Sequence, residues 1–213
     1  MKKLSLLMVI AGVMGLLAGT GRAEMSRTIE AFDQCGVIVD PHTFFNAARD
    51  AGAVVVAHQE VAGRSLVTEA GVYAFIETPE NAQRLSPTVP GSVVRIRGKL
   101  LQEGALVYID SLELQTRVPL IDFARYRNDA GEQVTLKGVN KCQCGLEVGG
   151  LPRTCALGHL HHLEAADGRI YHYLQFAQGK QAFLGEGFHF QSVEVKAKRL
   201  PGNYLLVDSA QVE

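Results

Sequence analysis

The stretch VRIRGKLL at residues 94–101 recurs as VEVKAKRL at residues 193–200, an offset of 99 residues. After a short turn, YIDS at residues 108–111 matches LVDS at residues 206–209 at an offset of 98. Apolar and charged residues alternate before each turn, and β-branched or aromatic residues resume after it, which is typical of a half-buried antiparallel hairpin. A repeat of this period predicts a duplicated domain rather than a solenoid.

Each hairpin is preceded by two expected strands and a short expected helix. These elements lie at residues 64–69, 72–77 and 79–85 in the first half, and at residues 159–164, 169–176 and 179–184 in the second. With residues 134–139 as an opening strand, the second half has the order strand, long loop, hairpin, helix, hairpin, which resembles the five-stranded OB-type barrel. In the first half we expect an additional helix at residues 41–51 and a first strand at residues 54–57.

The predicted fold is therefore mainly β, with two tandem OB-like five-stranded barrels, each carrying a short helix between its third and fourth strands. The N-terminal domain is expected at residues 24–117, a linker at residues 118–130 and the C-terminal domain at residues 131–213. About 190 residues after the leader suit two small domains.

Residues 1–23 have the features of a secretory signal peptide. Lys2 and Lys3 precede a mostly apolar run at residues 4–17, and Gly21 and Ala23 are small residues placed for cleavage. The run is shorter than the about 20 apolar residues that span a bilayer, and no second run is long enough. We expect a periplasmic or secreted protein that begins at Glu24 and is not stably inserted in the membrane.

Charge disfavours nucleic acid as a partner. Removal of Lys2, Lys3 and Arg22 leaves 18 basic and 22 acidic residues, a formal net charge of −4. The basic residues are interleaved with acidic ones, whereas phosphate binding requires a basic stripe. We therefore expect a metal ion or another envelope protein as the partner.

Six thiols and imidazoles lie within 21 residues of the second half. They are Cys142, Cys144, Cys155, His159, His161 and His162. If residues 141–145 continue the strand that starts at Val134, alternation places the first two thiols on one face, and the turn at residues 149–152 brings the third back over them. The predicted ligands of Zn²⁺ or Cu(I) are Cys142, Cys144, Cys155 and one of His159 or His161.

Two other interpretations of these cysteines stay open. A disulfide from Cys142 or Cys144 to Cys155 would close a loop of about a dozen residues and stabilise the barrel by about 3 kcal/mol, leaving a metal-free interaction or scaffolding module. A reactive thiol pair would instead indicate a thiol-disulfide oxidoreductase. Cys35 is expected to be a buried small residue.

The hairpin in the second half can be aligned by its turn. A two-residue turn at Asp167-Gly168 places Leu163 opposite His172, so that His161 and His172 share one face while His162 lies on the other. A shift of one residue would reverse every assignment.

The second half is similar to a family of small, uncharacterised secreted bacterial OB-like domains. Such domains begin Gly-x(2–4)-Cys-x-x-Cys and carry another Cys before a Gly-x-x-Tyr-x-Leu strand. Matching residues here are Gly138, Cys142, Cys144, Cys155, Gly168 and Tyr171, with Tyr173 in place of Leu and one residue instead of two between the first two cysteines. The resemblance covers about the last ninety residues and implies export.

Catalytic motifs are lacking. The chain contains no Gly-x-Ser-x-Gly elbow, phosphate-binding glycine loop, His-Glu-x-x-His sequence or Cys-x-x-Cys-His haem motif. Asp110-Ser111 and Asp208-Ser209 recur in both halves and are expected to make local turns. The sequence predicts a binding protein rather than an enzyme.

Overall fold

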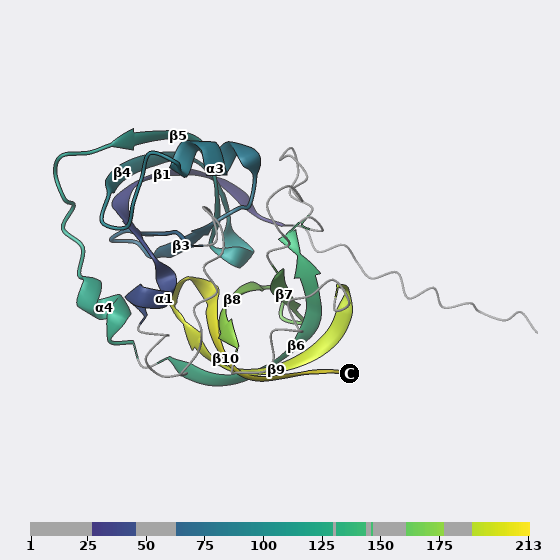
Figure 1. Cartoon of the computed structure of the whole chain (residues 1–213). Helices are drawn as coiled ribbons and strands as arrows, with labels where there is room; N and C mark the ends of the chain where they lie inside the picture. The colour runs from purple at the N-terminus through teal and green to yellow at the C-terminus, as the bar shows by residue number, and fades with distance from the viewer. Residues whose placement is uncertain (1–26, 46–62, 130, 144–145, 147–160, 177–188) are drawn as a thin grey trace, which may run out of the picture.

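Two closed five-stranded β-barrels in tandem make up the fold, as the sequence predicts (Figure 1). The computed structural model describes residues 27–45, 63–129, 131–143, 146, 161–176 and 189–213. The first barrel consists of β1 (Ile29–Val39), β2 (Ser65–Val67), β3 (Val72–Phe75), β4 (Val93–Leu101) and β5 (Leu106–Leu114). The second consists of β6 (Glu132–Cys142), β7 (His161–Ala165), β8 (Ile170–Phe176), β9 (Gln191–Leu200) and β10 (Tyr204–Val212).

Both barrels have the same strand order. In the first, the order β1-β2-β3-β5-β4 closes through the antiparallel pairing of β1 with β4, and β3 runs parallel to β5. In the second, β6-β7-β8-β10-β9 closes through β6 and β9, and β8 runs parallel to β10. This mixed five-stranded order is that of the OB-type barrel.

The first barrel begins earlier than the sequence predicts. Its opening strand is β1, which corrects the expected first strand at residues 54–57; those residues lie outside the described part. Apolar alternation in β1 is interrupted at Gln34-Cys35-Gly36, which hides the strand from a periodicity argument. Of the helix expected at residues 41–51, the described part forms α1 (Pro41–Phe44), which Asp40 caps by accepting a hydrogen bond from the Thr43 amide at 2.9 Å.

A second helix, α3 (Pro79–Leu85), lies between β3 and β4 as predicted. Thr78 caps it by accepting from the Asn81 amide at 3.0 Å, and Pro79 occupies the first turn. The buried Asn81 side chain donates to the Ile76 carbonyl, directly after β3, and accepts from the Ile109 amide of β5, so it joins α3 to both segments. The helix expected at residues 179–184 of the second barrel lies outside the described residues.

The repeat extends to irregular features of the strands. In β5 the ladder skips Asp110, and in β10 it skips Asp208, so both aspartates are β-bulge residues within a strand and not turn residues at a strand's end. Gly36 and Gly138 also correspond, because a Cβ on them would lie 2.5 Å from the Val67 carbonyl oxygen and 2.2 Å from the Glu164 carbonyl oxygen, respectively.

The two barrels pack against each other around an approximate two-fold axis. The β4–β5 turn η1 (Gln102–Gly104) meets β8, and the β9–β10 turn η5 (Pro201–Asn203) meets β3. A Cβ on Gly104 would lie 3.2 Å from Ile170 Cβ, and a Cβ on Gly202 would lie 2.7 Å from the Val72 carbonyl oxygen. These two contacts correspond under the 98-residue repeat, which is the reciprocal arrangement of an isologous interface.

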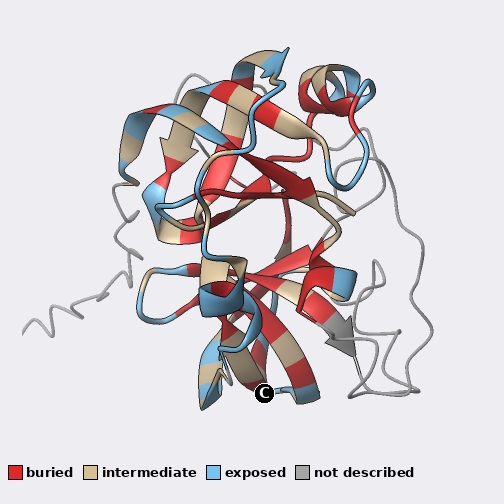
Figure 2. Cartoon of the chain, turned by 90° about the vertical axis from the view of Figure 1, so that its left-hand side faces the viewer, coloured by how far each residue is buried: buried red, intermediate tan, exposed pale blue. Residues whose placement is uncertain are grey.

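Equivalent apolar residues of both barrels form the core of this contact. Buried residues, red in Figure 2, continue from one barrel to the other. The interface core includes Val72, Ile76, Leu101 and Leu106 of the first barrel and their counterparts Ile170, Leu174, Leu200 and Tyr204 of the second. Separate clusters fill the barrel interiors, with Ile38, Phe75 and Ile109 in one and Leu163, Tyr171 and Val195 in the other.

Polar contacts at the interface join the same elements. The Ser65 and Tyr204 hydroxyls hydrogen-bond to each other, the His172 Nε2 atom lies 2.7 Å from the Gly104 carbonyl oxygen, and Asn203 donates to the Glu103 carbonyl at 3.0 Å. The apolar core and these bonds together fix the orientation of the barrels. Within the described residues, no helix has the length and apolar character needed to cross a membrane.

Candidate metal centre

Cys142 and His161 face each other across two neighbouring strands at one end of the second barrel. They are directly opposed in the β6–β7 ladder, and their exposed fractions are 1% and 2%. Two residues along the same ladder, Asn140 is opposed to Leu163, which belongs to the barrel core. Strand alternation therefore places the thiol and the imidazole on the interior face, beside each other.

A third side chain at this end is one that the sequence did not identify as a candidate. The His189 ring centroid lies 4.6 Å from that of His161, with 53° between the ring planes. Both ring nitrogens of His161 and the Nε2 atom of His189 are buried. The following residue, Phe190, donates its amide to the Asn140 carbonyl at 2.8 Å, which joins the beginning of β9 to the end of β6.

Three of the predicted ligands, Cys144, Cys155 and His159, lie outside the described residues. Among the residues that are described, no three His, Cys, Asp or Glu side chains are close enough to hold a metal ion. The structure thus brings Cys142 and His161 together and leaves the remainder of the predicted ligand set as a prediction.

The predicted hairpin alignment is wrong by one residue. His162 is opposed to His172, and Leu163 to Tyr171. Ala165 donates to the Arg169 carbonyl at 2.9 Å, and Gly168 has φ of +87°, so the loop has three residues with glycine in the left-handed position instead of two. His161 and His172 consequently lie on opposite faces, and His172 belongs to the contact between the barrels.

The outer face of β7 carries a partly buried ion network. Glu164 Oε1 lies 2.5 Å from Arg27 Nη2, and Glu164 Oε2 lies 2.6 Å from Lys141 Nζ. Burial opposes ionisation of Glu164, but the approach of His162 and Lys141 and the charge of Arg27 outweigh it and lower the pKa of this carboxyl to about 2. Burial also lowers the pKa of His162. This network anchors the chain near residue 27 to the second barrel.

The first barrel holds the cysteine motif in place from outside. Gln143, between Cys142 and Cys144 in sequence, is 2% exposed, and its Oε1 atom accepts a hydrogen bond from the Glu77 amide at 2.6 Å. Leu146 is buried in the core between the barrels, and its amide donates to the Gln143 carbonyl at 2.9 Å. The residues on both sides of positions 144 and 145 are therefore fixed against the first barrel.

Among the described residues, the equivalent end of the first barrel has no matching thiol and imidazole pair. By strand register, Asp40 and Arg64 stand where the second barrel has Cys142 and His161. Asp40 caps α1, and Arg64 Nη1 donates to the Leu85 carbonyl at 2.5 Å. The sequence predicted that Cys35 is buried, and this prediction is wrong. Cys35 is exposed and lies opposite Arg95 of β4.

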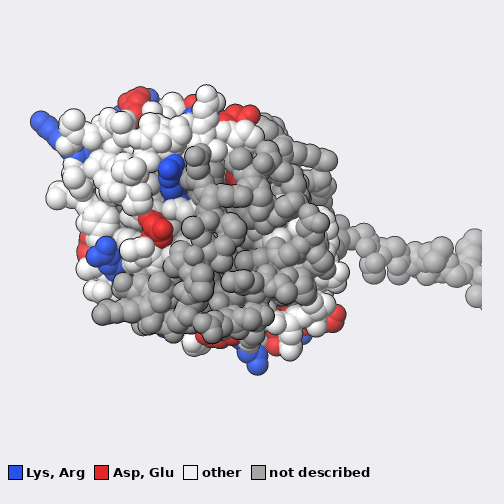
Figure 3. Space-filling view, in the orientation of Figure 1, with Lys and Arg blue, Asp and Glu red and all other residues white. Residues whose placement is uncertain are grey.

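The charged surface of the first barrel is mixed. On β1, β4 and β5, Asp33 accepts from Arg95 at 2.8 Å, and Arg97 donates to Glu113 at 2.8 Å. The hydrogen bond from Arg95 lowers the pKa of Asp33. On the face drawn in Figure 3, the described basic and acidic side chains are interspersed. Pairing of this kind neutralises the surface locally.

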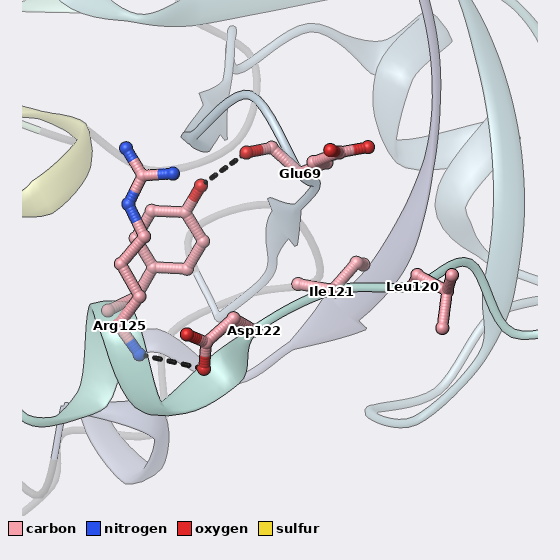
Figure 4. Close-up of a pocket in the computed structure, with 6 residues that line it drawn as sticks. Glu69, Leu120, Ile121, Asp122 and Arg125 are labelled. Atoms are coloured by element: carbon pink, nitrogen blue, oxygen red, sulfur yellow. Dashed lines mark hydrogen bonds between the residues drawn. The ribbon is translucent and has the colours of Figure 1, made fainter.

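An open pocket of about 480 Å³ lies beside the connection between the barrels, where α4 (Phe123–Arg127) follows β5. The Tyr126 hydroxyl donates to the Glu69 carbonyl at 2.8 Å, and the Arg125 amide donates to Asp122 at 3.2 Å; Figure 4 shows Arg125 and Asp122 in this pocket. Glu69, Leu120 and Ile121 complete the lining. The described residues that line the pocket combine charges of both signs with exposed apolar surface, and none of them is a cysteine or a histidine.

The shared interface also restricts where ligands can bind. OB-type barrels commonly bind ligands on the outer face of strands 2 and 3 and on the turn between strands 4 and 5. Here the outer faces of β3 and β8 and the turns η1 and η5 are packed against the other barrel. In the second barrel, the chemically distinctive surface is thus the end that carries Cys142 and His161.

The fold is thus a tandem pair of OB-like barrels, and in the second barrel Cys142 and His161 are opposed at one end. Comparison with known proteins finds no family model, no curated protein and no solved structure that matches the chain.

Proposed function

We propose that this chain is an exported metal-binding protein whose second barrel holds one Zn²⁺ or Cu(I) ion. The observation that carries the proposal is the direct opposition of Cys142 and His161, both buried, on the interior face of β6 and β7. A thiolate and an imidazole at neighbouring positions are ligands that both ions accept. We propose Cys144 and Cys155 as further ligands on the sequence argument, with His159 as the alternative to His161.

The packing of the second barrel supports this role. Ligands bind tightly when the surrounding structure fixes their positions before the ion arrives. The strand ladder fixes Cys142, and the hydrogen bond from the Glu77 amide to Gln143 fixes the residue that follows. In this proposal the first barrel is a rigid support for the site.

Metal content tests the proposal directly. Protein purified under reducing conditions is expected to retain about one Zn or Cu per chain by inductively coupled plasma and native mass spectrometry. Cys142→Ser is expected to lose the metal, and Cys35→Ser is the matched control because its exposed thiol lies on the other barrel. Absence of Zn and Cu from the reduced wild-type protein, or full retention in Cys142→Ser, contradicts the proposal.

Thiol counting separates the metal site from a disulfide staple. A metal site releases four reactive thiols per unfolded chain after chelation, without a reductant, whereas one disulfide leaves two. N-terminal sequencing of the protein from the envelope fraction tests the export part of the proposal, with Glu24 as the expected first residue.

A further inference from the structure

The turn that precedes β9 has a phenylalanine at a left-handed position, where its counterpart in the first barrel has a glycine. Gly91 donates its amide to the Ile38 carbonyl at 2.7 Å, and Phe190 donates to the Asn140 carbonyl at 2.8 Å. Under the 99-residue repeat these positions are equivalent, and both have positive φ, +97° for Gly91 and +59° for Phe190. Glycine adopts this conformation without steric cost, but an aromatic residue adopts it only where the surrounding structure imposes it.

Burial of the Phe190 side chain does not account for this conformation. The residue is 61% exposed. Strained backbone of this kind tends to occur where a neighbouring group must be held in a particular place. The neighbour here is His189, which stands where the first barrel has Pro90, and whose ring packs on His161.

We propose that His189 is a further ligand of the centre at Cys142 and His161, and that the left-handed turn at Phe190 exists to present it. The inference rests on the proposed metal-binding function. Two imidazoles and a thiolate are a mixed nitrogen and sulfur set, which tetrahedral Zn²⁺ accepts. With His189 as a ligand, only one of the two further thiols proposed above is needed to complete the four ligands of that geometry.

Coordination requires a movement of one side chain. In the structure the rings of His161 and His189 are packed against each other, and no three such groups among the described residues meet at one point. Coordination would therefore need the His189 ring to turn away from the His161 ring while the backbone of the turn stays in place. Because the turn is bonded to Asn140, the backbone of His189 stays beside the end of β6.

The experiment is titration of the chelated, reduced full chain with Co²⁺ and with Zn²⁺ in competition. His189→Gln is expected to weaken zinc affinity at least tenfold and to change the d–d absorption bands of the Co²⁺ form. Phe190→Gly is the matched control, because glycine preserves the turn, and it is expected to keep the wild-type spectrum and affinity. Circular dichroism confirms that each variant is folded.

A second measurement uses the unmodified protein. Long-range ¹H–¹⁵N spectra are expected to show a coordinated His189 ring nitrogen on addition of Zn²⁺. Unchanged affinity and bands in His189→Gln, or an unperturbed His189 ring in the zinc-bound wild type, overturn this inference while the metal-binding function stands. A wild-type chain that binds neither ion overturns both.

Discussion

Replacement of His172 by glutamine is expected to remove much of the acid sensitivity of the contact between the barrels. His172 is buried, and its Nε2 atom lies 2.7 Å from the Gly104 carbonyl oxygen. Burial outweighs this hydrogen bond and lowers the pKa of His172 from 6.5 to about 4. The folded protein therefore excludes a proton that the unfolded chain binds.

The size of the effect follows from this difference in pKa. Above pH 6.5 the imidazole is neutral in both states, and its titration does not change the free energy of unfolding. Between pH 6.5 and about 4 the unfolded chain binds the extra proton, so the free energy of unfolding falls by about 1.4 kcal/mol per pH unit. The whole window amounts to about 3 kcal/mol, a large part of the roughly 5–15 kcal/mol that stabilises a typical domain.

Urea denaturation of wild type and His172→Gln from pH 7 to pH 4.5 measures this loss. Glutamine retains a donor for the Gly104 carbonyl and does not titrate. The groups that face His172 are His162 on β7, Tyr204 on β10 and the Gly104 carbonyl of η1, and all remain in the variant. The wild type is expected to lose more stability than the variant at each step, and His42→Gln controls for the loss of an imidazole elsewhere. Parallel curves for wild type and His172→Gln refute the reasoning.

Three further outcomes follow from the interface and from thiol exposure. Tyr204→Phe and Ser65→Ala each remove the same buried hydrogen bond, so each is expected to lower the free energy of unfolding by about 1 kcal/mol, and a double-mutant cycle by thermal denaturation should show coupling. A Cβ in Gly202→Ala would lie 2.7 Å from a carbonyl oxygen of β3, whereas a Cβ in Gly91→Ala would have no atom within 4 Å. Gly202→Ala should therefore lower the free energy of unfolding in urea by about 1–3 kcal/mol more than Gly91→Ala. Cys35 is exposed and should react with Ellman's reagent in the native protein, and Cys35→Ser should lower the number of reactive thiols by one per chain.

The sequence was sufficient to predict the two barrels because hairpins with equivalent charge alternation recur in both halves. It was insufficient where a polar interruption, an extra loop residue or a β-bulge changed the bounds or the register of a strand. In β1, the polar residues before Gly36 interrupt the alternation, and the three-residue loop that ends at Gly168 shifts the β7–β8 hairpin by one residue. Asp110 appeared to mark a turn because a β-bulge inside a strand has no distinct sequence pattern.

The contact between the barrels is reflected in one strand that is apolar on both faces. Residues 72–76 read Val-Tyr-Ala-Phe-Ile, apolar on both faces of the strand, which predicts a strand buried on both sides. One face fills the first barrel, and the other meets the second. The partner of the outer face could not be inferred from one strand, because it lies about a hundred residues away in sequence.

For the candidate site, the sequence analysis named Cys142 and His161 as ligands but did not name His189, which we propose as a ligand. A comparison of the two halves would have pointed to His189. Pro90-Gly91 in the first half corresponds to His189-Phe190 in the second. Loss of a glycine at a left-handed turn conflicts with local preference, and such conflicts tend to mark function. The cysteine motif lies within one stretch of sequence. The pairing of β9 with β6 brings His189, which is distant in sequence, to the same end of the barrel.

The approximate two-fold arrangement is compatible with a proposed metal centre in the second barrel alone. Both barrels bury the same outer face, so that face must stay apolar in each, and its residues correspond across the repeat. The barrel ends are not subject to this constraint and have diverged. In the first barrel, Asp40 at such an end caps a helix; in the second, the equivalent Cys142 faces His161. Because the Glu77 amide donates to Gln143 of this end, the first barrel holds the residue next to Cys142 in place.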